Sequence, residues 1–179
     1  MSEIGAAEPW AVRETGVPDD DELRQRESVF ALANGHIGLR GNLDEPEICG
    51  MPGTYLNSLF EERDLSYPEE GYAFPKRTET IVDAPNAKPI TLTVGGERFD
   101  VRTGTVTRHE RVLDLRRGTL VREVEWISPN GVHLSLRTER LVSFTRPSIA
   151  AIRYTARADA PLRAESDVRV NEEPPEQRD

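Results

Sequence analysis

The fold class follows from residues 120–136, which read LVREVEWISPNGVHLSL. Apolar residues recur at every second position on both sides of a Pro-Asn-Gly turn, so each half has one apolar face. Arg122 breaks the apolar face, while Glu123 and Glu125 lie on the opposite face. This pattern predicts two antiparallel strands joined by a tight turn.

The same period of two extends from residue 78 to residue 156. Residues 90–94 alternate and precede a Gly-Gly turn, and residues 113–115 run into a turn at Arg117-Gly118. Strands recurring at about 8–12 residue spacing with turns between them predict an all-β, antiparallel two-sheet β-sandwich with little helix. We expect its core to include Phe30, Leu32, Ile37, Leu39, Ile90, Leu92, Val94, Phe99, Leu113, Leu115, Val124, Trp126, Leu134, Leu136, Ile152 and Tyr154.

The amino-terminal half is less regular. Residues 18–24 predict an acidic bend with at most one helical turn, and residues 27–41 predict a hairpin around Asn34-Gly35, where both turn positions favour positive φ. Residues 42–76 lack periodicity and are expected to form a loop that carries Tyr55 and Phe60 toward a partner surface. Because an exposed apolar patch drives association, we expect self-association or a homodimer.

Composition limits the partners of the chain. The 179 residues carry a formal net charge of −9 and have no basic stripe, which argues against nucleic acid and against an anionic membrane surface. Cys49 is the only cysteine, and residues 1–10 lack the pattern of a signal peptide, so we expect a cytoplasmic protein. The expected organisation is a flexible N-terminus at 1–9, a β-sandwich domain at 10–169 and a polar C-terminal tail at 170–179.

Residues 27–42 read ESVFALANGHIGLRGN. The pattern E-S-x-F-x-L-x-N-G-x-x-G-x-R-G-N resembles the opening motif of the family of maltose, trehalose and kojibiose phosphorylases and acid trehalases, glycoside hydrolase family 65. Further stretches resemble the family in register: GTY at 53–55, LDLRRG at 113–118, LVR at 120–122, Trp126 and ERLVS at 139–143. The resemblance covers roughly residues 10–167.

The resemblance implies a galactose-mutarotase-like super-sandwich, in an incomplete version because the sandwich of the family is larger. In the family, a linker, an (α/α)₆ barrel with the general-acid glutamate, and a small β domain follow. The implied function is an accessory N-terminal domain of a glycoside hydrolase or disaccharide phosphorylase acting on α-glucosides such as maltose, trehalose or kojibiose. The chain is then non-catalytic by itself and has no catalytic residue of its own.

The same resemblance implies the partners and cofactors. The partners are an (α/α)₆ barrel, in cis or in trans, and the α-glucoside disaccharide that the parent enzyme binds. No cofactor is expected, although inorganic phosphate is a co-substrate if the parent enzyme is a phosphorylase.

The candidate site residues lie in the hairpin motif and just after it, and they are Asn34, Gly35, Arg40, Gly41, Asn42 and Tyr55. In one interpretation they face the mouth of the barrel and contact substrate or the domain interface. In the other, they build a glycine-rich hairpin that packs tightly. Asn, Arg and Tyr suit sugar hydroxyls and turn capping equally well, so both interpretations stay open.

Other chemistry has weaker support. Glycoside cleavage needs two placed carboxyl groups, but Glu123 and Glu125 fit a solvated sheet face beside arginines. Glu27 and Asp114 are expected to be hydrogen-bond partners of Arg40 or Arg116. The three histidines, His36, His109 and His133, lack metal-ligand spacing, so no metal site is expected.

Two alternatives remain, a stand-alone carbohydrate-binding sandwich and an oligomerisation module. The first needs a row of exposed aromatic side chains, whereas most strand aromatics fall on core-facing positions.

Overall fold

The structure, a computed structural model, describes residues 3–46, 50, 53–66 and 71–168. Cys49 and the predicted tail at 170–179 lie outside these residues. Within them the chain forms strands β1 (Glu3–Glu8), β2 (Ala11–Thr15), β3 (Leu32–Ala33), β4 (Ile37–Leu39), β5 (Thr54–Asp64), β6 (Arg77–Asp83), β7 (Ile90–Val94), β8 (Glu97–Arg98), β9 (Thr105–Asp114), β10 (Thr119–Ile127), β11 (His133–Val142), β12 (Ala150–Ala158) and β13 (Leu162–Ser166), and helix α1 (Asp20–Val29).

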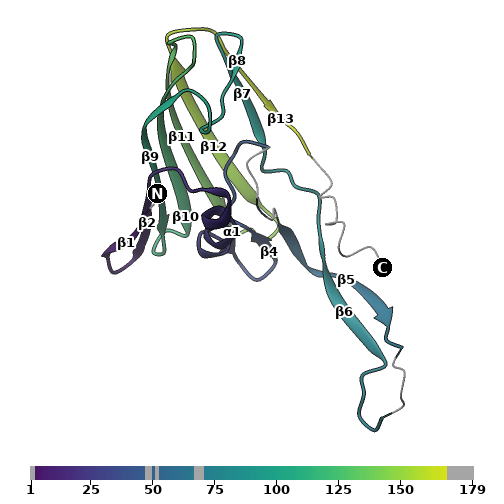
Figure 1. The fold of residues 1–179 in the computed structure, drawn as a ribbon. Helices are drawn as coiled ribbons and strands as arrows, with labels where there is room; N and C mark the ends of the chain where they lie inside the picture. Colours follow the sequence, from purple (N-terminus) through teal and green to yellow (C-terminus); the bar gives the residue numbers. More distant parts are fainter. Residues whose placement is uncertain (1–2, 47–49, 51–52, 67–70, 169–179) are drawn as a thin grey trace.

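The strands form an antiparallel sandwich, as predicted (Figure 1). One layer is a six-stranded sheet in the order β1-β2-β9-β10-β11-β12. The other layer consists of a three-stranded sheet, β13-β7-β8, together with α1 and the hairpin at the start of a four-stranded sheet, β3-β4-β5-β6. Residues 120–136 form the central β10–β11 hairpin of the large sheet, in which Trp126 pairs with Leu134.

Two hydrophobic clusters hold the layers together. The first joins β7 and the residues after β8 to the large sheet, and it consists of Leu23, Leu43, Leu92, Val94, Phe99, Val101, Val124, Trp126, Leu134 and Leu136. The second lies beneath the β3–β4 hairpin, and it consists of Phe30, Leu32, Ile37, Leu39, Leu113, Leu120 and Val142. Burial of apolar side chains from both layers supplies the main driving force for this packing.

Helix α1 is longer than the single turn predicted from the acidic bend. Asp19 and Glu22 form a capping box, in which the side chain of each accepts a hydrogen bond from the backbone N–H of the other. The helix includes residues 27–29, which the sequence pattern assigned to a strand, so β3 is only two residues long. No helix within the described residues is long and apolar enough to cross a membrane.

The segment 42–76 contains a long strand and is not the irregular loop that we predicted. Strand β5 pairs with β4 at its base and with β6 along its length. The two strands project from the body of the sandwich as an arm (Figure 1). The register shifts between Tyr55 and Phe60, and this irregularity hides the period of two in the sequence.

Two smaller differences concern the edges of the large sheet. Glu3–Glu8, inside the segment expected to be a loose N-terminus, form β1 and pair with β2. Leu115, predicted as core, is 52% exposed because β9 ends at Asp114 and the chain turns before Leu115 can reach the interior. Ile90, Ile152 and Tyr154 are half-buried. The other predicted core residues, apart from Leu115, are buried.

The contrast between Trp126 and Leu115 tests this core. Trp126 is 1% exposed and donates a hydrogen bond to the Thr103 carbonyl. Its ring packs edge-on against the Phe99 ring, with 5.3 Å between the ring centres. We expect Trp126→Ala to lower the free energy of unfolding by about 3–5 kcal/mol, and Leu115→Ala by less than about 0.5 kcal/mol. Urea denaturation at low protein concentration measures both, and equal losses would contradict the assigned core.

Candidate functional site

The predicted site residues come together around the β3–β4 hairpin and the loop that follows β4. Asn34 flanks the turn of the hairpin and Gly35 lies within it. Arg40, Gly41 and Asn42 follow the hairpin, and Tyr55 lies on the neighbouring strand β5, opposite Gly38. The structure therefore brings these six residues to one region of the fold. Whether any of them contacts a sugar stays a prediction.

Both polar atoms of the Asn34 side chain form hydrogen bonds within the protein itself. Its Oδ1 accepts hydrogen bonds from the backbone N–H groups of His36 and Ile37, at 2.9 and 2.8 Å. Its Nδ2 donates to the carbonyls of Ser143 and Pro147, at 2.6 and 3.0 Å. Asn34 thereby ties its own turn to the β11–β12 turn. The Asn34 N–H donates to the Ile37 carbonyl at 3.2 Å, so the central turn residues are Gly35 and His36, one position later than predicted. Of these two, only Gly35 has a positive φ, +86°.

Arg40 and Gly41 anchor the chain where it leaves β4. The guanidinium of Arg40 donates to the Arg24 carbonyl at 3.2 Å and lies 3.7 Å from the buried carboxylate of Glu27. Gly41 is buried, and a Cβ there would lie 2.5 Å from the Phe30 carbonyl oxygen. No larger residue fits without moving the backbone, so Gly41 is required for close packing.

Asn42 begins a buried loop that crosses the inner face of the large sheet. Its Nδ2 donates to the Leu43 carbonyl, and its own carbonyl accepts a hydrogen bond from Arg140. Gly35, Arg40 and Tyr55 keep some exposure, whereas Asn42 is 3% exposed. A ligand could therefore touch the first three directly, and Asn42 acts by shaping the loop.

A set of six buried charges lies beneath this loop, and we call it the charged layer. Its members are Glu14, Asp44, Glu45, Arg111, Arg122 and Arg140. The three arginines come from three adjacent strands, β9, β10 and β11, and point at the loop. Positive and negative charges balance, as burial of ionised groups requires.

The contacts within the charged layer are close, and the Arg122–Glu45 pair is bidentate. Arg122 binds both oxygens of Glu45, at 2.5 and 2.8 Å, and reaches Asp44 at 3.1 Å. Arg140 binds Asp44 at 2.5 Å and the Asn42 carbonyl at 2.8 Å. Guanidinium–carboxylate pairs of this geometry are strong and directional. They fix the backbone of the loop against three strands at once.

Arg111 completes the layer on the other side. Its Nε lies 2.5 Å from Glu14, and its Nη1 donates to the Gly41 carbonyl at 2.7 Å. The guanidinium also lies over the ring of Phe30, 4.6 Å from the ring centre. Burial, opposed by the contact with Glu14, lowers the pKa of Arg111 below its ordinary value.

The electrostatics of the layer keep Asp44 ionised. Burial alone would raise the pKa of Asp44, but the adjacent guanidinium groups of Arg140 and Arg122 hold it below its ordinary value. Burial would likewise lower the pKa of Arg122, yet Glu45 and Asp44 raise it above the usual range. Asp44 therefore has no proton to give to a glycosidic oxygen at neutral pH.

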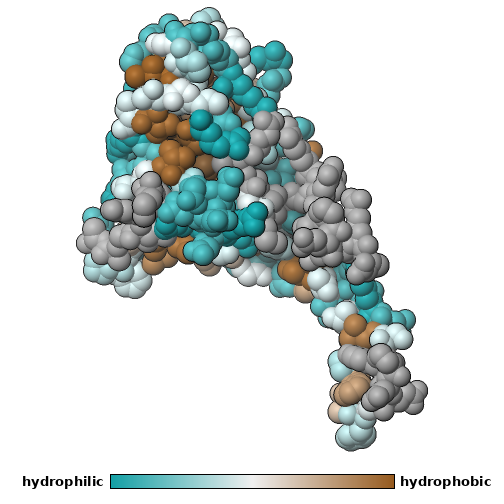
Figure 2. All heavy atoms as spheres, viewed as in Figure 1, coloured by the Kyte–Doolittle hydropathy of each residue, from teal (hydrophilic) through white to brown (hydrophobic). Residues whose placement is uncertain are grey.

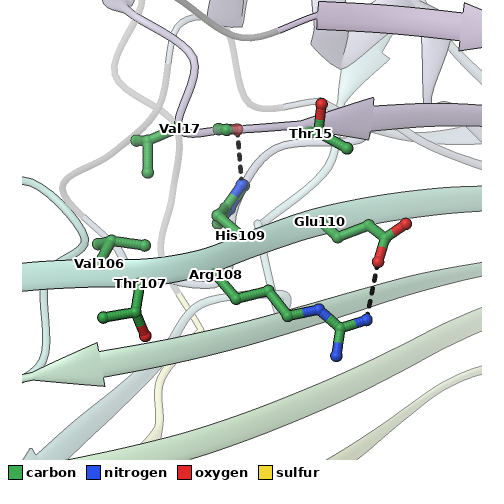
Figure 3. A pocket seen from close by; sticks show the side chains of 8 residues that line it. Thr15, Val17, Val106, Thr107, Arg108, His109 and Glu110 are labelled. Carbon is green, nitrogen blue, oxygen red and sulfur yellow. Dashed lines mark hydrogen bonds and ion pairs between the residues drawn. The ribbon is translucent and has the colours of Figure 1, made fainter.

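His109 lies beside the layer at the floor of a pocket of about 380 Å³ (Figure 3). Arg122 can only donate, so Nε2 of His109 accepts its hydrogen bond and Nδ1–H donates to the Gly16 carbonyl, at 3.1 and 2.8 Å. Burial and the positive charge of Arg122 lower the pKa of His109 to about 3. The imidazole is neutral, and both of its nitrogens are already used.

The remaining lining of the pocket offers no free acid. Glu110 pairs with Arg108, at 2.8 Å, and with Arg13. Glu123, on the outer face of the sheet, is paired with Arg137 and Arg108, in agreement with the predicted solvated face. No group of three or more His, Cys, Asp or Glu side chains within the described part of the chain is placed to hold a metal ion.

The charged layer was not predicted from the sequence. The available signal was an arginine at an apolar-facing strand position, Arg122, with a second at Arg140 on the next strand. Glu27 is buried and near Arg40, as predicted, whereas Asp114 accepts from the backbone N–H groups of Arg116 and Arg117. These carboxylates therefore have structural roles.

Comparison with known proteins assigns this arrangement to a family. The family model described as the N-terminal domain of glycosyl hydrolase family 65 matches residues 12–174. An uncharacterized glycosyl hydrolase of Mycobacterium tuberculosis is 51% identical over 172 residues, which are 94% of this chain and 22% of that protein. An α,α-trehalose phosphorylase of Thermoanaerobacter brockii is 41% identical over 152 residues, or 83% of this chain and 20% of its own length.

The fold is also that of a solved structure, described as a kojibiose phosphorylase from the human microbiome. The TM-score is 0.78 at 23% identity, over 90% of this chain and 21% of the other. This likeness concerns the fold. The chain spans about a fifth of the length of the curated relatives it matches.

The charged layer can be tested by removing one buried cation. Arg140→Met would leave Asp44 without its closest partner and the Asn42 carbonyl without its donor. We expect a loss of about 3–5 kcal/mol in the free energy of unfolding. Arg137→Met is the matched control on the same strand, since its exposed pair with Glu123 should contribute less than about 1 kcal/mol. Equal losses in chemical denaturation would show that the layer is not a main source of stability.

His109 predicts a dependence of stability on pH. The unfolded imidazole takes up a proton below about pH 6.5, whereas the folded one stays neutral to about pH 3. The contribution is therefore full above pH 6.5 and is lost as the pH falls toward 3, by at most about 1.4 kcal/mol per pH unit. We expect His109→Gln, which can donate and accept without titrating, to show a shallower loss in urea denaturation between pH 7 and pH 4.

The control for this experiment is His133→Gln at an exposed position, which should follow the unaltered protein. If His109→Gln and His133→Gln give the same pH dependence, His109 is not held neutral.

Proposed function

Because the chain belongs to glycosyl hydrolase family 65, as its N-terminal domain, we propose that it is the accessory domain of an enzyme that acts on α-glucosides such as maltose, trehalose or kojibiose. In this role the chain does not cleave the glycosidic bond itself. It shapes and supports a catalytic (α/α)₆ barrel, present in cis or in trans, through the surface around the β3–β4 hairpin.

The observation that carries this proposal is that the carboxylates of the charged layer and of the described pocket are paired with arginines. Cleavage requires an acid on the leaving oxygen and an attacking group on the opposite face of the sugar, both inside a pocket. Asp44 and Glu45 are buried and bound by arginines, and Glu110 at the described pocket is paired as well. These pairs support a structural use of charge.

The kinship with an α,α-trehalose phosphorylase supports the α-glucoside substrate class. If the parent enzyme is a phosphorylase, inorganic phosphate is its co-substrate, and we propose no other cofactor. The acidic net charge supports a protein that binds neither nucleic acid nor membranes. The single cysteine supports a cytoplasmic location.

Within this proposal Asn34, Gly35, Arg40, Gly41, Asn42 and Tyr55 form the surface that meets the barrel or the substrate. Gly35, Arg40 and Tyr55 supply contacts, while Asn34, Gly41 and Asn42 hold the backbone in place. A second copy of the chain is a further proposed partner. Exposed aromatic side chains on the arm also favour the alternative role of an oligomerisation module.

We expect the isolated chain to be inactive. The purified chain is incubated with maltose, trehalose and kojibiose, with and without phosphate, and assayed for glucose and glucose 1-phosphate. Neither product should form, because no free general acid lines the described pocket. Turnover that persists through purification and disappears on substitution of one of the chain's own carboxylates would overturn the accessory role.

The supporting half of the test is a chimera. This chain replaces the matching fifth of the Thermoanaerobacter brockii trehalose phosphorylase, and a variant without that segment is the control. The chimera should release glucose 1-phosphate from trehalose, while the deletion variant should be inactive or unfolded.

A further inference from the structure

The chain contains two Asn-Gly pairs, Asn34-Gly35 and Asn130-Gly131. In such a pair the backbone nitrogen of the glycine can attack the side-chain amide carbon of the asparagine, because the glycine has no Cβ to hinder the approach. Both pairs lie at strand-to-strand turns, the first between β3 and β4 and the second between β10 and β11. The structure distinguishes them by the way in which each asparagine side chain is held.

The two glycines are equally accessible. Gly35 and Gly131 are both exposed and have positive φ angles, +86° and +82°. A Cβ added at either position would have no heavy atom within 4 Å, apart from those of the adjacent residues in the chain. Access to the glycine nitrogen therefore does not separate the two pairs.

The Asn34 side chain is held by four hydrogen bonds. Two come from the backbone N–H groups of His36 and Ile37, and two go to the carbonyls of Ser143 and Pro147. To meet the Gly35 nitrogen, the amide carbon would have to leave this position, and the contacts with two turns would be lost together. The reactive conformation of this pair is therefore strongly disfavoured in the folded chain.

The Asn130 side chain is exposed and makes one hydrogen bond within the described residues, from Nδ2 to Oε1 of Glu97 at 2.6 Å. The Gly131 N–H donates to the Ser128 carbonyl at 2.8 Å, so attack by its nitrogen also requires this turn to open. The turn lies at the end of the sandwich near β7 and β8 (Figure 1), where Figure 2 shows mostly hydrophilic residues. Exposed turns of this kind open locally at a small cost in free energy.

We propose that Asn130-Gly131 is a site of spontaneous deamidation, whereas the fold protects Asn34-Gly35. The Gly131 nitrogen gives its proton to solvent and bonds to the amide carbon of Asn130. The bond from that carbon to Nδ2 breaks, and ammonia leaves with a proton from solvent. Water then opens the resulting five-membered imide at either carbonyl, which gives aspartate or isoaspartate at position 130. Water is the co-reactant, and no electrons are transferred.

The modification would weaken a contact between the two layers. Oε2 of Glu97 is buried without a hydrogen-bond partner, so within the described residues the Asn130 amide is the side-chain donor to this carboxyl group. Glu97 belongs to β8 in the three-stranded sheet, and Asn130 follows β10 in the six-stranded sheet. Deamidation replaces the donor with a second carboxyl group, which is an acceptor when ionised and repels a like charge. The contact between the β8 strand and the β10–β11 turn is therefore lost.

The first experiment compares the two pairs in one sample. The purified chain is aged in a mildly alkaline buffer and digested with trypsin, which places the pairs in separate peptides, residues 27–40 and 123–137. Neither peptide contains another Asn or Gln, so a mass gain of about 1 Da in either one reports its Asn-Gly pair. We expect the 123–137 peptide to gain mass at least about tenfold faster, because three fewer side-chain hydrogen bonds must break.

Two controls show whether the fold sets this difference. In concentrated urea both peptides should gain mass at similar rates, because the hydrogen bonds that protect Asn34 are then absent. Asn130→Gln keeps an amide donor on an exposed turn but disfavours closure of the ring, and its 123–137 peptide should keep its mass.

The second experiment measures the consequence for stability. Asn130→Asp imitates one product, and we expect it to unfold at a lower urea concentration than Asn130→Gln at neutral pH. Adding Glu97→Gln to Asn130→Asp supplies an amide donor from the other side and should restore the urea midpoint.

Three results would overturn the proposal. Equal rates for the two peptides in the folded chain would show that the hydrogen bonds of Asn34 do not protect it. A folded chain whose 123–137 peptide keeps its mass would show that Asn130 is not a site of modification. Equal urea midpoints for Asn130→Asp and Asn130→Gln would show that the contact with Glu97 does not join the layers. The modification is independent of the proposed accessory role, so an inactive chimera would leave it unaffected.

Discussion

The inner face of the large sheet cannot be buried without the loop 41–45, because three arginines on that face need the charges and carbonyls that the loop supplies. Arg111, Arg122 and Arg140 lie between the two hydrophobic clusters, so the apolar interior is divided by a polar band. Burial of one unpaired guanidinium would cost several kcal/mol. Sheet and loop therefore form together, and the β3–β4 hairpin is positioned by the same contacts.

This constraint explains what the sequence could predict of the fold. Strands β9 to β11 show the period of two because their inner faces are buried and their outer faces are solvated. The pattern failed where other interactions dominate. Helix α1 starts at a capping box between Asp19 and Glu22 and continues into residues 27–29, which were predicted as strand. An irregularity after Tyr55 hid the length of β5. Leu115 followed the right period but lies beyond the end of its strand.

The candidate site was predictable in position but not in chemistry. A family-like motif located Asn34 to Asn42. Nothing in the sequence indicates that the side-chain amide of Asn34 hydrogen-bonds both to its own turn and to the β11–β12 turn. The charged layer depends on pairs far apart in the chain, such as Asp44 with Arg140, separated by 96 positions. A single sequence contains no record of such pairing. Arg122 and Arg140 at inward strand positions were the local signs that buried carboxylates pair with them.

The distribution of charge over the molecule links its stability to its proposed role. Carboxylates that could act as acids are bound by arginines in the interior, and His109 is held as a neutral imidazole by Arg122 and Gly16.

The surface presents a turn that the hydrogen bonds of Asn34 fix in place, and an arm with exposed apolar side chains. A domain built this way is suited to holding other parts of an assembly in place, because its buried polar groups are fixed by ion pairs and several of its exposed side chains are apolar. The arm and the hairpin leave the sandwich from the same four-stranded sheet, so a partner that orders the arm also orders the β4–β5 pairing next to Arg40 and Tyr55.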